Sequence, residues 1–265
     1  MSRQVQARVV FLGTGTSHGV PMIGCDCAVC RSEDPRDKRL RPSVYVDVPS
    51  YARLLIDAGP DLRQQALVNH VTHVDAILLT HAHADHILGL DEVRRFNVLR
   101  GSSIPCYASE STWQTVWKTF HYIFDGVPRI GGGIPKLDPH EIRGPLAIQG
   151  VSVVPVPLWH GEMPVLGFRF GGFAYLTDCN RIDESSMALV SGVDTLVIDA
   201  LRDRPHVTHF SVSEALEVIA RLKPRRAYMT HMTHDLGHEA TSARLPEGVH
   251  LAYDGLVLDV RVDVE

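Results

Sequence analysis

Residues 78–92 read LLTHAHADHILGLDE, an apolar strand pattern that runs directly into four potential metal ligands: His81, His83, Asp85 and His86. In extended backbone, alternate side chains point to the same side, so His81 and His83 can approach one point in space. Asp85 and His86 open the helix that follows and turn toward a neighbouring point. Imidazole and carboxylate together suit zinc, manganese or iron. The HxHxDH pattern therefore predicts a metal site rather than a solvated polar turn.

Three further apolar strand patterns also end in a residue that can bind a metal. PVPLWH ends at His160, FAYLTD at Asp178 and AYMTH at His231. Because α/β proteins place their sites at the carboxyl ends of strands, we expect these residues to meet the first four. Taken singly, each histidine could be a hydrogen-bonded core residue, and the aspartate could be a turn former. The HxHxDH motif favours the joint interpretation as metal ligands.

Short β-branched runs alternate with helical patterns along the chain, which is typical of an α/β protein. The predicted strands are too many for one ordinary sheet, so we expect two packed sheets with helices outside. Gly171 and Gly172 predict a tight hairpin, while Ser211 and Glu214 form a capping box at a helix start. Residues 126–139 are rich in Gly and Pro and are expected to form a long surface loop. The expected strands span residues 7–13, 43–48, 53–58, 74–80, 104–108, 151–156, 165–170, 173–177, 195–200, 227–230 and 256–262, and the expected helices 60–69, 87–99, 111–124 and 213–222.

The composition is that of a folded, soluble protein, with 45% hydrophobic and 22% charged residues among 265. The longest stretch without a charged residue, 144–161, is interrupted by Pro145, Pro155 and Pro157, so no membrane-spanning helix is expected. The beginning of the chain has no signal-peptide pattern, which predicts a cytoplasmic protein with reduced thiols. A net charge of −5 gives no electrostatic footprint for an extended nucleic acid, and 15 histidines point to metal or acid–base chemistry.

Three of the five cysteines form a C-x-C-x-x-C cluster in the segment GVPMIGCDCAVCRS: Cys25, Cys27 and Cys30. Closely spaced thiolates in a reducing compartment are typical of a structural zinc site that needs a fourth ligand. The alternative is that these cysteines pack as small hydrophobic residues. Cys106 and Cys179 have no such neighbours, and we expect them in the core.

Together these motifs resemble the metallo-β-lactamase superfamily, and the resemblance covers nearly the whole chain. It implies a four-layer αββα sandwich, which we expect to be a single domain over residues 1–265 with a cysteine-triad zinc loop at about residues 19–42. The resemblance also implies two divalent ions, zinc or manganese, that Asp178 bridges. One ion is assigned His81, His83 and His160, and the other Asp85, His86 and His231. Asp57, in RLLIDAG, matches an acidic motif that supports the ligands by hydrogen bonding.

The cysteine triad narrows the resemblance to the PhnP-like phosphodiesterases, the cyclic phosphate dihydrolase group. This resemblance implies one structural zinc held by Cys25, Cys27, Cys30 and His234, with His238 as the alternative fourth ligand. It assigns to His209 a contact with the scissile phosphate or protonation of the leaving oxygen, and His206 is the competing candidate. The opening FLGTGTSHGVP resembles the N-terminal loop of that group, so its hydroxyl residues Thr14, Thr16 and Ser17 are expected to line the phosphate pocket.

The expected function is hydrolysis of a small or cyclic phosphodiester, nucleotide-like or ribose-phosphate-like, by a hydroxide that bridges the two metals. In this hypothesis Asp85 holds the proton of the nucleophile, and His209 stabilises or protonates the departing oxygen. The expected partner is that small-molecule substrate, and a homodimer is a candidate assembly. One alternative is a tRNA-processing nuclease of the same superfamily, although the sequence has no long Lys/Arg run for such a substrate. Another is a non-catalytic metal scaffold or an accessory protein of cofactor biosynthesis.

Overall fold

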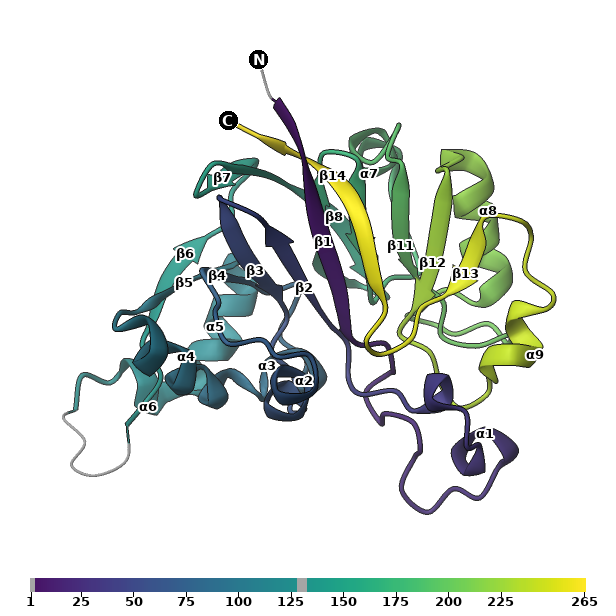
Figure 1. Ribbon diagram of the computed structural model, residues 1–265, viewed down its shortest axis with the longest axis horizontal. Coiled ribbons are helices and arrows are strands. Elements are labelled where there is room, and N and C mark those ends of the chain that lie inside the picture. Colours follow the sequence, from purple (N-terminus) through teal and green to yellow (C-terminus); the bar gives the residue numbers. More distant parts are fainter. Residues whose placement is uncertain (1–2, 128–132) are drawn as a thin grey trace.

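The structure is a computed structural model that describes residues 3–127 and 133–265. Two layers of strands pack face to face, and helices cover the outer side of each layer (Figure 1). This arrangement confirms the predicted four-layer αββα sandwich. Among the described residues, no helix is long and apolar enough to cross a bilayer.

The strands form two layers, and most of the helices lie beside one layer or the other. The first layer contains β1 (Arg3–Gly13), β2 (Ser43–Val48), β3 (Ala52–Ile56), β4 (Ala76–Leu78), β5 (Ile104–Ala108), β6 (Leu137–Glu141), β7 (Leu146–Ile148) and β14 (Val257–Val264). The second contains β8 (Val151–His160), β9 (Met163–Phe170), β10 (Phe173–Leu176), β11 (Thr195–Asp199), β12 (Arg226–Thr230) and β13 (Val249–Leu251). Beside the first layer lie α2 (Leu62–Val68), α3 (Ala84–Ile87), α4 (Val93–Arg100), α5 (Glu110–Thr119) and α6 (His121–Phe124). Beside the second lie α7 (Glu184–Leu189) and α8 (Val212–Leu222), while α1 (Ala28–Arg31) belongs to the cysteine segment and α9 (His238–Ser242) precedes β13.

One hydrogen-bonded path joins all the strands, in the order β13-β12-β11-β10-β9-β8-β14-β1-β2-β3-β4-β5-β6, with β7 paired to β8. Strand β8 belongs to both layers. Its first residue, Val151, pairs with β14, and the part from Val154 onward pairs with β9. Proline cannot donate to a ladder, and Pro155 and Pro157 lie in the part of β8 that pairs with β9 and not with β14 or β7.

The core lies in three layers, because the strands are buried on both faces. In β3, Leu54 and Ile56 point into the core between the two sheets, while Leu55 points outward to the helices. Successive side chains of a strand alternate between its faces, so both faces must be apolar here. This explains why the strands read as continuous apolar runs in the sequence.

The structure confirms two local predictions at the level of single residues. The hairpin at Gly171-Gly172 joins β9 to β10, with Phe170 paired to Phe173. The capping box is complete, because the Ser211 hydroxyl accepts from the backbone N–H of Glu214 and the Glu214 carboxylate accepts from that of Ser211.

Several predicted boundaries were wrong. The helix expected over residues 87–99 is divided into α3, a 3-10 turn at Leu90–Glu92 and α4. The chain approaches itself closely here, since a Cβ at Gly89 would collide with the carbonyl oxygen of Gly59. The helix expected over residues 111–124 is interrupted at Phe120, whose backbone conformation is not helical. The loop expected over residues 126–139 contains the start of β6, and its residues 128–132 lie outside the described residues. Strands β6, β7 and β13 were not predicted.

Candidate metal centre

The predicted ligands come together around Asp178 at the carboxyl ends of the strands. The Oδ2 atom of Asp178 lies 3.2 Å from Nε2 of His86, 3.2 Å from Nε2 of His231 and 3.7 Å from Nε2 of His81. Three groups of side chains whose ligand atoms lie within 4.8 Å of one another share this aspartate. Their members are Asp85, His86, Asp178 and His231; His81, His83 and Asp178; and His160, Asp178 and His209.

At three strand ends near the centre, the chain bends sharply into a left-handed backbone conformation. Asp57, Asp178 and His231 have φ angles of 62°, 53° and 61°, although none is glycine. Such backbone is uncommon for these residue types and is often found at functional sites. Each bend comes within two residues of the end of a strand, β3, β10 or β12, and directs the side chain toward the shared edge.

Asp57 is fully buried and forms hydrogen bonds with His86 of the HxHxDH segment and with Thr80, which precedes that segment. Its Oδ2 accepts hydrogen bonds from Nδ1 of His86 at 2.7 Å and from the hydroxyl of Thr80 at 2.8 Å, and its Oδ1 accepts from the Thr80 N–H at 2.8 Å. A histidine that donates through Nδ1 presents Nε2 as its free nitrogen. Asp57 therefore sets the direction in which Nε2 of His86 faces the centre.

His209 has a buried carboxylate partner that the sequence analysis did not find. Nδ1 of His209 donates to Oδ2 of Asp199 at 2.7 Å, and the same oxygen accepts from the N–H of Cys179 at 2.8 Å. The His209 ring stacks on the His231 ring with centroids 4.7 Å apart. The signal was present, since TLVIDA is another apolar strand that ends in an aspartate, beside the strand that leads to Asp178.

The rings of His206 and His160 both lie close to that of His209. The His206 ring centroid is 5.2 Å from that of His209, and His206 Nδ1 lies within hydrogen-bond distance of the hydroxyl of Thr208. His160 donates through Nδ1 to the carbonyl of Thr208 at 2.8 Å, which leaves its Nε2 free. Of the two predicted acid candidates, His209 alone forms a hydrogen bond with a carboxylate within the part of the chain that the structure describes.

The charges of the centre are strongly coupled. Burial lowers the pKa of the imidazoles of His81 and His160. Burial also opposes a charge on His86 and His231, but the neighbouring carboxylates, Asp178 above all, raise the pKa of His86 well above its usual range and that of His231 to about 9. Burial opposes a charge on Asp178, yet these histidines hold the pKa of its carboxyl well below its usual range.

The donor atoms fit divalent cations. Within the described residues, Nε2 of His86 and both ring nitrogens of His231 are buried without a hydrogen-bond partner. Buried polar atoms are normally satisfied, so Nε2 of His86 and Nε2 of His231, which lie beside the Asp178 carboxylate, are the atoms expected to face a metal. Imidazole nitrogens with carboxylate oxygens are a typical donor set for zinc or manganese.

The cysteine triad forms a second cluster at one end of the molecule. Nδ1 of His234 lies 3.1 Å from Sγ of Cys25, 3.4 Å from Sγ of Cys27 and 3.5 Å from Sγ of Cys30. These four ligand atoms lie within 4.8 Å of one another. Three thiolates and one imidazole make a typical structural zinc set.

His238, the alternative fourth ligand, lies elsewhere. Its ring packs edge-on against Tyr253 at 5.7 Å, and its backbone N–H donates to the Asp37 carboxylate at 2.8 Å. The structure thus places His234, and not His238, with the cysteines. Cys106 and Cys179 are fully buried in the core.

A cavity of about 510 Å³ opens beside Asp85. Its lining includes Ser17, His18 and Arg41 together with the apolar Met22, Ile23 and Pro60. Thr14, which we expected in a phosphate pocket, is buried, and its hydroxyl donates to Asp254 at 2.8 Å. Thr16 is also buried and does not line this cavity. Of the three predicted hydroxyl residues, only Ser17 lines it.

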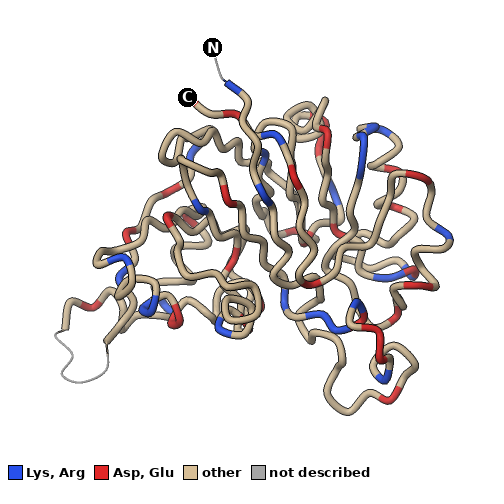
Figure 2. Tube along the Cα trace, in the orientation of Figure 1, with Lys and Arg blue, Asp and Glu red and all other residues tan. Residues whose placement is uncertain are grey.

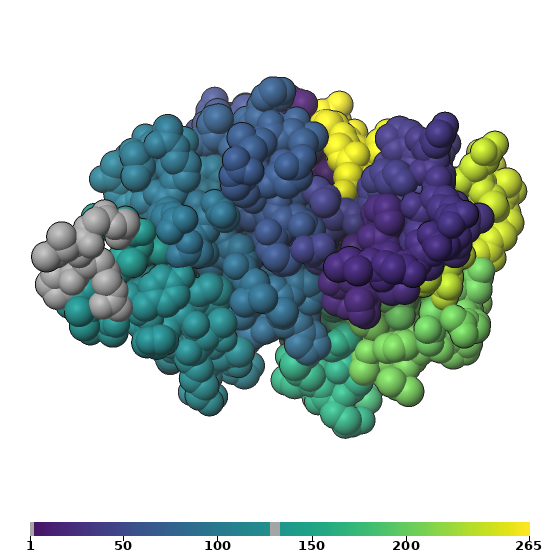
Figure 3. All heavy atoms as spheres, turned by 90° about the horizontal axis from the view of Figure 1, so that it is seen from below, coloured from purple at the N-terminus to yellow at the C-terminus, as the bar shows by residue number. Residues whose placement is uncertain are grey.

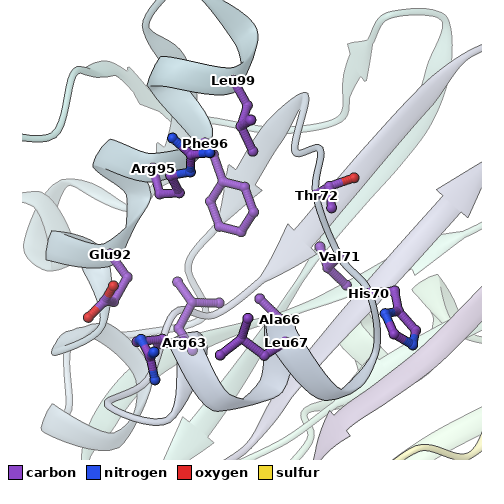
Figure 4. A pocket seen from close by; sticks show the side chains of 11 residues that line it. Arg63, Ala66, Leu67, His70, Val71, Thr72, Glu92, Arg95, Phe96 and Leu99 are labelled. Carbon is purple, nitrogen blue, oxygen red and sulfur yellow. The ribbon is translucent and has the colours of Figure 1, made fainter.

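A second cavity of about 420 Å³ lies between α2 and α4 (Figure 4). Its lining includes the buried apolar residues Leu62, Val71 and Phe96 and the exposed residues Arg63 and Arg95. None of the predicted ligands, all of which are in the described residues, lines it. The cavity beside Asp85, by contrast, is lined by one of the candidate ligands, Asp85 itself.

Comparisons with known proteins agree with this geometry. Residues 52–232 match the β-lactamase superfamily domain. A solved structure described as a new diphosphatase from the PhnP family is 44% identical, has a TM-score of 0.91, and covers 98% of this chain and 99% of its own. An octanoyltransferase from Porphyromonas gingivalis is 36% identical over 94% of this chain, which spans only 51% of that relative. The coenzyme PQQ synthesis protein B from Methylobacterium nodulans is 27% identical, and the match covers 72% of each chain.

Proposed function

Since the chain belongs to the β-lactamase superfamily and has the metallo-β-lactamase fold, we propose that its metal centre hydrolyses a small or cyclic phosphodiester. The observation that carries this proposal is the convergence on Asp178 of the predicted ligands, next to a histidine that is held by a buried carboxylate. The similarity to the PhnP-family diphosphatase supports a phosphate ester as the substrate.

In this proposal His81, His83 and His160 would hold one divalent ion, Asp85, His86 and His231 would hold the other, and Asp178 would be a ligand shared by the two sets. When bound, such ions would supply an activated water nucleophile and neutralise the charge that develops on the phosphate oxygens. The cluster of Cys25, Cys27, Cys30 and His234 would hold a third ion, zinc, and this ion would support the fold around the site.

The protein's own residues position the reaction. Nδ1 of His209 donates to Asp199, so the His209 ring can present a proton at Nε2 to the departing oxygen. The hydrogen bond to the Asp199 carboxylate fixes the direction of the ring. Asp85 is buried at the wall of the substrate cavity, where its carboxylate can hold a proton of the attacking water.

The cavity beside Asp85 favours a small substrate. The guanidinium of Arg41 lies at its wall and is held by Asp61, with Nε and Oδ2 3.0 Å apart. A volume of about 510 Å³ is in the range of small-molecule sites. Lys and Arg residues are interspersed with Asp and Glu along the described chain (Figure 2), which does not favour the tRNA-processing nuclease.

An accessory role in cofactor biosynthesis is the second candidate, because the chain resembles the coenzyme PQQ synthesis protein B. One experiment separates the two functions. The purified, metal-loaded protein is assayed with bis-p-nitrophenyl phosphate and with a panel of cyclic and linear phosphodiesters, with Asp178→Ala as the control. Turnover that disappears in Asp178→Ala supports the hydrolase. Metal-loaded wild-type protein that turns over none of these esters supports the accessory role.

A further inference from the structure

Arg39 is a buried arginine that the proposed reaction does not use. It is 1% exposed, although arginine is almost never fully buried without partners. Its Nη1 donates to the carbonyl of Thr233 at 2.8 Å, and its Nη2 donates to the carbonyl of Leu236 at 2.5 Å and to Asp37 at 3.2 Å. Nη1 and Nη2 thus each donate to a carbonyl of one short segment, residues 233–236, while Nε has no hydrogen-bond partner within the described residues.

Residues 231–236, which include this segment, connect the two metal sites. His231 faces the centre around Asp178, and His234, three residues later, faces the cysteine cluster. The backbone between them is paired on both sides, because Met232 N–H donates to the Thr14 carbonyl at 2.9 Å and the Met232 carbonyl accepts from Thr16 N–H at 3.2 Å. Figure 3 shows the purple N-terminal segment lying against the green and yellow C-terminal part of the chain.

Arg39 is also tied to the cysteine segment. Its backbone N–H and carbonyl pair with the carbonyl and N–H of Val20, at 2.7 and 2.8 Å. Asp37, which accepts from Arg39, also accepts from the backbone N–H of His238 at 2.8 Å. The charged side chain therefore bridges the base of the cysteine segment to both ends of the turn that carries His234.

The chemistry of this contact favours a guanidinium over other side chains. Burying a charge is unfavourable unless hydrogen bonds compensate for the lost water. A planar guanidinium can donate in several fixed directions at once, whereas a lysine ammonium is a compact point charge. An apolar residue of similar length could fill the same space. The charged group of Arg39 therefore serves the hydrogen bonds to the two carbonyls.

We infer that Arg39 is a positioning residue that fixes residues 231–236 and couples the cysteine site to the catalytic centre, so that each site's metal affinity depends on the other. The inference rests on the two metal assignments proposed above, but not on the identity of the substrate. Coupling between binding sites is reciprocal, so metal in the cysteine site must change the metal affinity of the catalytic centre by the same factor as metal in the catalytic centre changes that of the cysteine site. Partners that orient metal ligands typically change metal affinity about 10- to 100-fold.

The test compares Arg39→Met and Arg39→Lys with Arg36→Met in the metal-loaded full chain. Arg36 belongs to the same segment, but its ion pair with Asp34 is at the surface, and it is the matched control. Two quantities are measured: amide hydrogen exchange of the peptide that contains Met232 and Thr233, and the rate at which zinc passes to a chromophoric chelator. We expect faster exchange and roughly 10- to 100-fold faster zinc release in Arg39→Met. Arg39→Lys, the milder variant, is expected to lie between the wild type and Arg39→Met.

A second arm tests the coupling itself. Cys27→Ser is titrated with zinc or manganese, and the affinity of the catalytic centre is expected to fall together with that of the cysteine site. Exchange and zinc release in Arg39→Met and Arg39→Lys that match those of Arg36→Met would overturn the positioning role. An unchanged catalytic-centre affinity in Cys27→Ser would overturn the coupling. Neither readout requires turnover, so a wild type that hydrolyses no ester would contradict the proposed function without altering this result.

Discussion

The carboxylate of Asp199 accepts a hydrogen bond from Nδ1 of His209 at 2.7 Å, and both side chains are buried beside the metal centre. The second hydrogen bond to this carboxylate, from the N–H of Cys179, fixes it to the residue that follows Asp178. The pair is therefore oriented by the same strand ends that place the candidate ligands. This arrangement suits a general acid that must be held in one direction.

His209→Ala is expected to lower kcat by about 10²- to 10⁴-fold, because it removes the proton donor to the leaving oxygen. Asp199→Asn should lower kcat less, since the ring remains but loses the carboxylate that orients it. Elemental analysis of both variants checks the assignment, and we expect the metal content of the wild type. Loss of a metal ion in His209→Ala would show instead that His209 is a ligand.

Asp57→Ala is expected to weaken metal binding at the catalytic centre by roughly 10- to 100-fold, because it leaves His86 without the acceptor that orients its ring. The measurement is the metal affinity of the apo-protein by competition with a chelator. Asp75→Ala is a control, since Asp75 is bonded to His73 away from the centre. Equal affinities in the two variants would contradict the role of Asp57.

Arg41→Met is expected to raise KM for an anionic ester by roughly 10- to 100-fold with little change in kcat, since a charge-assisted hydrogen bond contributes about 1.5–3 kcal/mol. Arg63→Met is the matched control, because Arg63 lines the other cavity (Figure 4). The measurement is the KM and kcat of both variants by steady-state kinetics with the same substrate. A KM that changes equally in both variants would mean that Arg41 makes no specific contact.

Asp254 predicts a pH dependence of stability. Burial raises the pKa of its carboxyl to about 7, although hydrogen bonds from Leu40 N–H and the Thr14 hydroxyl oppose the shift. Between the ordinary value of about 4 and pH 7, the folded state keeps a proton that the unfolded state releases. The Asp254 contribution to the free energy of unfolding must therefore fall as the pH rises through this window and change little above it.

Urea unfolding at several pH values measures this contribution as the difference between wild type and Asp254→Asn. The wild type should lose stability relative to the variant from about pH 4 to pH 7, by up to about 1.4 kcal/mol for each pH unit. A difference that stays constant over this range would contradict the raised pKa.

Much of the fold and of the candidate site could be predicted because the signals are local. The strands are buried on both faces, so their apolar runs are visible in the sequence, and a ligand-type residue at a strand end is conspicuous. Asp199 carries the same signal but was not identified, because an aspartate after a strand is also an ordinary turn former. Its partner, His209, is ten residues away in sequence, and the two side chains meet only because the chain between them folds back.

Other features depend on contacts that local patterns do not show. His234 and His238 both follow His231 closely, and only the path of the intervening loop places His234 against the thiols. The break between α3 and α4 arises from the close approach of Gly89 to Gly59, which is 30 residues earlier in the chain. Strand β6, with the sequence LDPHE, has little apolar character and forms because β5 offers it an edge.

The most direct test of the account is elemental analysis of the purified protein at saturating metal, with turnover of a phosphodiester measured on the same samples. We expect about three metal ions per chain in the wild type, loss of one zinc in Cys27→Ser, and loss of turnover in Asp178→Ala. A wild-type protein with one metal ion or none, and without turnover, would contradict the assignment of a dinuclear hydrolytic centre.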